Sequence, residues 1–139
     1  MKKKNCLKEL LAVGMAWIAL SAGAQEKGSL TVHIEGLRNN EGKVMIALTD
    51  KEIPTDMSFI GADMAQADST GMKFFFGEVP AMTVYVQVFH DENGNFQPDM
   101  TPEGKMKEGV GSLPGSSARP SVAVEPDKNN EMTIKMLYF

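Results

Sequence analysis

Apolar and polar residues alternate along several short segments of this chain. In residues 30–35 the even positions are Leu, Val and Ile and the odd positions are polar, and Val84, Val86 and Val88 repeat the pattern later. A period of two is the signature of a strand with one buried face. Alternation, or a run rich in β-branched and aromatic residues, predicts strands over residues 30–35, 44–48, 72–76, 83–90, 121–124 and 132–137.

The segments between these strands carry turn residues and no helical period. Residues 36–42 are rich in Gly and Asn, which tolerate positive φ, and predict the turn of a hairpin. Residues 49–71 show no sustained period and predict a long connection between sheets, with at most one helical turn. Residues 109–117 are rich in Gly and Ser, like a phosphate-binding loop, but they lack its Gly-Lys-Ser/Thr ending. We interpret them as a flexible surface loop. Together these features predict an all-β domain, a sandwich or small barrel of about seven strands.

Residues 1–24 have the pattern of a cleavable signal peptide. Lysines at the N-terminus precede an apolar run over residues 10–20, and the small residues 22–24 follow it. The apolar run is shorter than the roughly 20 residues that span a bilayer. We therefore expect cleavage after Ala24 and no transmembrane segment in the remainder. A single domain over residues 25–139 would then be exported to the periplasm, the outer surface or the medium.

Charge and cysteine content narrow the classes of partner. The chain has 14 Lys and Arg and 18 Asp and Glu, and residues 1–24 hold four of the basic and one of the acidic residues. The rest therefore has a net charge of about −7, which argues against nucleic acid as a partner. The only cysteine, Cys6, lies in the predicted leader, so the exported domain has no disulfide and no thiolate metal site.

The loop after the strand 83–90 holds the one ligand-like group of side chains in the sequence. Asp91, Asn93, Asn95 and Asp99 occupy its first, third, fifth and ninth positions. At this spacing a curling backbone aims alternate oxygen ligands at one Ca²⁺ ion. Calcium is favoured over zinc because these ligands are hard oxygens. The alternative is that the Asp and Asn side chains form Asx-turns and accept backbone hydrogen bonds.

This loop differs from an EF-hand at two positions. Phe96 stands where the EF-hand has the glycine of its sharp turn, and Pro102 stands where it has the bidentate glutamate. Glu103 follows one residue later and replaces the bidentate glutamate as a ligand only if the loop has a different shape. Both alternatives, a Ca²⁺ site and a set of Asx-turns, therefore stay open.

His90 ends the strand 83–90 with the parity of its apolar residues, so its ring is expected to point inward. There it acts as a latch, hydrogen-bonded across the base of the loop to a carboxylate or a backbone carbonyl from residues 91–108. Glu108 closes the far end of this loop and is the second latch residue. The competing interpretation of His90 is a catalytic base, which needs a nucleophile and a pocket. No Gly-x-Ser-x-Gly or comparable nucleophile setting occurs in the sequence.

Three pieces of the chain resemble a known family. Residues 76–95 combine an aromatic residue, a Pro, a Tyr-containing strand that ends in His-Asp, and an Asn-rich loop. Residues 30–39 with 42–48, and residues 108–112, are similar to further parts of the same family, the domain-of-unknown-function (DUF) 2141 family of small secreted bacterial domains. The resemblance implies an immunoglobulin-like or transthyretin-like antiparallel β-sandwich. It implies no activity, because the family is functionally uncharacterised.

The function that these features favour is a non-catalytic binding or accessory module of the cell envelope, with residues 91–117 as its functional edge. A role for Ca²⁺ in stabilising the loop is left open. The expected partners are a cell-envelope protein, a polysaccharide or a peptide. One alternative is a small secreted hydrolase that uses His90 and Asp91. The other is a purely structural envelope protein, in which substitution of Asp91 or Asn93 changes stability and no binding.

Overall fold

The computed structural model describes residues 25–53, 59–116 and 118–139, so the predicted signal peptide lies outside the described residues. The described part contains no helix, which confirms the all-β prediction. It accordingly holds no helix long and apolar enough to cross a membrane. The strands are β1 (Lys27–Glu35), β2 (Lys43–Thr49), β3 (Gly61–Gln66), β4 (Met72–Pro80), β5 (Thr83–Asp91), β6 (Gly109–Ser112), β7 (Ser121–Ala123) and β8 (Asn129–Leu137).

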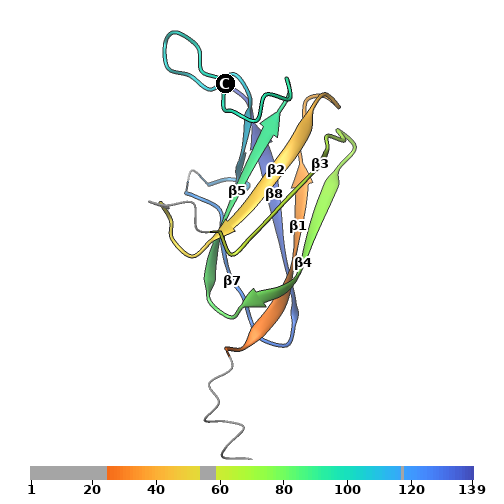
Figure 1. Cartoon of the computed structure of the whole chain (residues 1–139), viewed down its shortest axis with the longest axis vertical. Helices are drawn as coiled ribbons and strands as arrows, with labels where there is room; N and C mark the ends of the chain where they lie inside the picture. Colours follow the sequence, from red (N-terminus) through yellow and green to blue (C-terminus); the bar gives the residue numbers. More distant parts are fainter. Residues whose placement is uncertain (1–24, 54–58, 117) are drawn as a thin grey trace, which may run out of the picture.

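The strands form one eight-stranded sheet with the order β3-β2-β5-β6-β8-β1-β4, and β7 pairs with β5 beside this path. The sheet curls until its two end strands, β3 and β4, contact each other (Figure 1). It is therefore a nearly closed, barrel-like sheet. The apolar side chains on its inner face are shielded from water.

The core is built from the inward positions that alternation predicted. On β1, Leu30, Val32 and Ile34 are fully buried. On β4, Phe74 is buried whereas its neighbour Phe75 is exposed, because successive side chains of a strand point to opposite faces. Burial of this apolar surface is the main favourable term in folding. The remaining buried apolar residues are Leu37, Val44, Ile46, Leu48, Ala67, Val79, Val84, Val86, Val88, Val124, Ile134 and Met136.

The prediction of an antiparallel sheet is wrong for one pair of strands. β1 and β8 pair in parallel, with Ile34 opposite Ile134. Alternation of apolar residues is the same in either direction, so the local pattern carries no information on the direction of a partner strand. All six predicted ranges form strands, and β3 and β6, which the patterns did not predict, bring the number to eight, against the expected total of about seven.

Strand β3 replaces part of the connection that was predicted over residues 49–71. It pairs antiparallel with β2, with Met64 opposite Met45, so residues 63–66 form no helical turn. All of its residues except Gly61 are exposed. A strand without a buried face needs no alternating pattern, so residues 61–66 carry no signal of a strand. Residues 54–58 of the same connection lie outside the described part.

The prediction of a flexible loop is wrong for residues 109–112. These residues form β6, which pairs with β5 and with β8. A Cβ atom at Gly109 would lie 2.5 Å from Cε1 of Tyr138, and one at Gly111 would lie 2.7 Å from Cγ2 of Ile134. Both distances are well below the contact distance of carbon atoms. The glycines of β6 therefore let side chains of the neighbouring strands pack directly on its backbone.

We predict that Gly111→Ala lowers the free energy of unfolding by about 1–3 kcal/mol, because the new methyl group overpacks against Val88 and Ile134. Urea unfolding of variant and wild type measures the difference. Gly77→Ala is the matched control, since the nearest atom to its Cβ would be Cε1 of Phe75 at 3.6 Å, and its effect should be smaller. Equal stability of wild type and Gly111→Ala would contradict the close packing of β6.

Candidate functional site

The β5–β6 loop, residues 92–108, leaves the sheet at the end of β5 near the C-terminus (Figure 1). The turn between β1 and β2, residues 36–42, packs against the start of this loop. Gly42 has a φ of 67°, and a Cβ atom there would lie 1.9 Å from the carbonyl oxygen of Asp91. A glycine is required at this contact both by its backbone conformation and by the lack of space. Three segments that are far apart in the sequence therefore meet at one end of the barrel.

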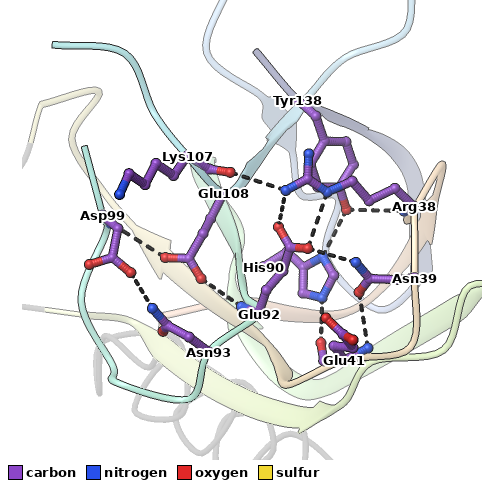
Figure 2. Close-up of polar contacts among 10 residues, drawn as sticks. All are labelled: Arg38, Asn39, Glu41, His90, Glu92, Asn93, Asp99, Lys107, Glu108 and Tyr138. Carbon is purple, nitrogen blue, oxygen red and sulfur yellow. Dashed lines mark hydrogen bonds and ion pairs between the residues drawn. The ribbon is translucent and has the colours of Figure 1, made fainter. Parts of the chain in front are cut away.

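His90 is fully buried at the end of β5, and both of its ring nitrogens have partners. Nε2 lies 2.7 Å from the carbonyl oxygen of Glu41, and Nδ1 lies 2.8 Å from the hydroxyl oxygen of Tyr138 (Figure 2). Because a carbonyl oxygen only accepts, Nε2 carries the proton and donates it to Glu41. In the neutral ring Nδ1 then accepts from the hydroxyl of Tyr138. The ring links the β1–β2 turn to the C-terminal end of β8.

The inward orientation predicted for His90 is confirmed, but its carbonyl partner comes from a different segment than expected. The partner belongs to the β1–β2 turn and not to residues 91–108. The reason is the pairing of β2 with β5, which sets Val44 opposite His90 and brings the turn to the end of β5. With a buried ring and two bonded nitrogens, His90 is not placed to take a proton from a substrate.

Tyr138 connects His90 to Arg38. Its hydroxyl oxygen accepts a hydrogen bond of 3.3 Å from the backbone N–H of Arg38. The guanidinium carbon of Arg38 lies 4.5 Å from the centre of the Tyr138 ring, which is the geometry of a cation–π contact. Burial raises the pKa of the Tyr138 hydroxyl. The hydroxyl therefore keeps its proton at neutral pH and remains a donor for His90.

Glu92, the first residue of the β5–β6 loop, is held by the β1–β2 turn. Its Oε1 accepts from Nη2 of Arg38 at 2.5 Å, and its Oε2 accepts from Nε of Arg38 at 3.1 Å and from Nδ2 of Asn39 at 2.6 Å. Burial raises the pKa of Glu92, but the hydrogen bonds from Arg38 and Asn39 outweigh it and hold the pKa below its ordinary value. The ionised carboxylate thus fixes the start of the loop to the sheet.

Glu108, the last residue of the loop, is buried and bonds to two backbone N–H groups. Its Oε2 accepts from the N–H of Glu92 at 2.6 Å, and its Oε1 accepts from the N–H of Asp99 at 3.4 Å (Figure 2). Burial raises the pKa of Glu108. Through these two hydrogen bonds, the Glu108 side chain joins the two ends of the loop to its middle. His90, in contrast, joins the β1–β2 turn to the C-terminal segment.

The structure brings three of the predicted Ca²⁺ ligands together. Nδ2 of Asn93 lies 2.5 Å from Oδ2 of Asp99, and Nδ2 of Asn95 lies 3.0 and 3.1 Å from the two oxygens of Asp99. These hydrogen bonds lower the pKa of Asp99. Oδ1 of each asparagine also accepts from the backbone N–H two residues later. Asx-turns, the alternative reading of this loop, are therefore present.

Asp91 is the fourth predicted ligand, and it is fully buried. Because His90 points into the core, Asp91 points to the outer face of β5, where the β5–β6 loop covers it. Its Oδ2 accepts from the N–H of Phe96 at 2.9 Å, so the carboxylate faces into the loop. Among the described residues, Oδ1 of Asp91 is the one buried side-chain oxygen or nitrogen with no hydrogen-bond partner.

The predicted ligand set consists of oxygen atoms of two kinds, carboxylates from Asp91 and Asp99 and amides from Asn93 and Asn95. Only two of the four residues are acidic. In the described part of the chain, no three His, Cys, Asp or Glu side chains are arranged to hold a metal ion. Any cation at this loop would therefore rely on amide and backbone oxygens as well as on carboxylates.

The sequence patterns missed the partners of His90 and Glu92. Tyr138 carries a signal that could have found it, since it continues the inward parity of Ile134 and Met136, and a buried Tyr hydroxyl needs a hydrogen-bond partner. Arg38 and Asn39 carry no such signal, because polar residues in a turn are expected to face water.

A family model described as an uncharacterized protein conserved in bacteria (DUF2141) matches residues 32–137. The chain belongs to the DUF2141 family. The match runs from β1 to the end of β8 and so includes the β5–β6 loop and its latch residues. No curated protein and no solved structure matches the chain. Membership of DUF2141 confirms the resemblance that residues 76–95 suggested, and it assigns no activity.

We predict that Glu92→Gln lowers the free energy of unfolding at pH 7 by about 1 kcal/mol. The effect is modest because Arg38 is 46% exposed and solvent screens the pair. The pKa of Glu92 is lower in the folded state. Its contribution is therefore complete above the pKa of an unfolded Glu, about 4.3, and is lost as the pH falls through the folded pKa.

Urea unfolding of wild type and variant over a range of pH measures this difference. Glu103→Gln, at an exposed glutamate of the same loop, is the matched control and should leave stability nearly unchanged. A difference between wild type and Glu92→Gln that is independent of pH would show that Glu92 acts by its shape and not by its charge.

Proposed function

We propose that this DUF2141 chain is an exported, non-catalytic accessory module of the bacterial cell envelope that binds a partner through its β5–β6 loop. The observation that carries the proposal is the contrast between the base and the tip of this loop. The base is tied to the β1–β2 turn by His90 and Glu92, and Glu108 joins the two ends of the loop. Binding residues are commonly found on loops that a rigid scaffold positions in this way.

Phe96 and Met100 define what we call the tip of the loop, and both carry exposed apolar side chains. Phe96 is 56% exposed and Met100 is 51% exposed. The tip also has a defined shape, since Met100 pairs with Met106 and the N–H of Lys107 donates to the carbonyl of Asp99 at 2.9 Å. A loop that is already ordered loses less conformational entropy on binding. These features support a recognition role over a purely structural one.

We take the partner to be a cell-envelope protein, because aromatic and Met side chains are enriched in the centres of protein interfaces. A polysaccharide or a peptide remains as the other outcome of the test below. The proposal also takes the curled sheet as an immunoglobulin-like or transthyretin-like sandwich. A single apolar core enclosed by the strands of the curled sheet supports this assignment.

The proposal predicts site-specific crosslinking from the loop tip. A photoreactive amino acid replaces Phe96 or Met100 in the bacterium that makes the protein, and irradiation should give a discrete crosslinked product in the envelope fraction. Phe75 is the matched control, because it is 63% exposed and lies on β4 outside the loop. Mass spectrometry identifies the attached molecule as protein, peptide or glycan.

A product from Phe96 or Met100 that is missing from Phe75 supports the loop as the binding edge. The same products from all three positions, or no product from the loop positions, would contradict the proposal. If the loop positions give no product, a purely structural role becomes the better account.

A further inference from the structure

The unpaired oxygen of Asp91 requires an explanation. A buried carboxylate oxygen without a partner is strongly unfavourable unless a hydrogen-bond donor or a cation compensates it. The other oxygen of the same carboxylate accepts from the N–H of Phe96, so the group is fixed and faces into the β5–β6 loop. The Asx-turns of Asn93 and Asn95 do not involve Asp91 and leave this oxygen unexplained.

We propose that the β5–β6 loop binds one Ca²⁺ ion through Asp91, Asn93, Asn95 and Asp99. The inference deepens the proposed function, since it concerns the same loop, but the cation site needs no partner to be tested. The unpaired Oδ1 of Asp91 supplies the ligand that the hydrogen bonds of the loop leave free. The bound cation would provide the missing countercharge.

The remaining ligands are already close to one another. Asp99 accepts hydrogen bonds from the amide nitrogens of both asparagines, so the three side chains lie close together, with the nitrogens and not the oxygens of the amides turned toward Asp99. The amide donors there supply partial positive charge to Asp99, and a cation would take over this role. Oδ1 of Asn93 and Oδ1 of Asn95 each accept one backbone hydrogen bond. An amide oxygen has two lone pairs, so each retains one for a metal ion.

The backbone of the loop also has the shape that the site needs. Phe96 has a φ of 61°, in the left-handed region, so the chain turns sharply at the sixth position although the residue is not glycine. The departure from the EF-hand pattern at Phe96 therefore does not prevent the turn. In a loop of this spacing the carbonyl oxygen at the seventh position, that of Gln97, is a further ligand.

The chemistry of the ligands selects calcium. All of them are hard oxygen atoms, and both nitrogens of the nearby His90 are occupied, which disfavours zinc. Amide ligands in a loop tolerate the irregular geometry that Ca²⁺ accepts and Mg²⁺ does not. With only two carboxylates the affinity should be weak, with a Kd of about 10⁻⁴–10⁻³ M, the range of extracellular modules.

The test is calcium titration of the purified protein, by calorimetry and by thermal unfolding in EDTA and in CaCl₂. A ligand that binds only the folded state raises Tm, and we expect a rise of about 5 °C at a Ca²⁺ concentration about ten times Kd. Magnesium at the same concentration should have a smaller effect. Asp91→Asn keeps an acceptor for Phe96 but removes the charge, and it should abolish the response. Asp99→Asn, at a more exposed position, serves if Asp91→Asn does not fold.

Two further variants separate a cation site from Asx-turns. Asn95→Asp keeps the acceptor for the N–H of Gln97 and adds a carboxylate, so it should lower stability in EDTA and increase the Tm rise in Ca²⁺. Asp68→Asn is the matched control. Asp68 also forms a turn, accepting from the N–H and the hydroxyl of Thr70, but it lies in the connection between β3 and β4. Its substitution should leave the calcium response unchanged.

The proposal is overturned if wild type shows neither heat of binding nor a Tm shift at Ca²⁺ concentrations about ten times the upper end of the expected Kd range. It is also overturned if Asp91→Asn and Asp99→Asn respond like wild type, because the ion would then bind elsewhere. These outcomes are independent of the crosslinking experiment. Calcium binding without a crosslink from the loop would support the cation site and contradict partner binding by the loop. A crosslink without calcium binding would support partner binding and contradict the cation site.

Discussion

The burial of the His90 ring is the constraint on which the arrangement around the β5–β6 loop depends. A buried imidazole needs a partner at each nitrogen, and here the partners are the carbonyl of Glu41 and the hydroxyl of Tyr138. One belongs to the β1–β2 turn and the other follows β8, so the ring joins the turn after the first strand to the segment after the last. Arg38 then reaches across the Tyr138 ring to Glu92 and ties the loop to the same group.

Alternation predicted the strands that have one buried face, because such strands must separate apolar from polar side chains. β1, β2 and β5 are of this kind. β3 is exposed along nearly its whole length, and two of the four residues of β6 are glycines that are required by contacts with Val88, Ile134 and Tyr138. Neither environment leaves an alternating pattern. The parallel pairing of β1 with β8 was hidden for another reason, since a local pattern does not depend on the direction of its neighbour.

The candidate site was predictable in part. Parity placed His90 inside, and loop spacing brought Asn93, Asn95 and Asp99 into one group that the structure also shows. The partners of His90 were not predictable, because a backbone carbonyl has no side-chain signature and Tyr138 becomes adjacent only through the sheet order. The unpaired oxygen of Asp91 was equally hidden, since it arises from the loop covering the outer face of β5.

The protonation of the His90 ring tests this account most directly. A long-range ¹H–¹⁵N correlation spectrum of labelled protein distinguishes the two ring nitrogens, and the partly exposed His33 provides an internal control. We expect a proton on Nε2 that exchanges slowly with water, a bare Nδ1, and no change of tautomer between wild type in EDTA and in Ca²⁺. A proton on Nδ1 in the neutral ring, or fast averaging like that of an exposed histidine, would contradict the bond to Glu41 and with it the account of the loop's base.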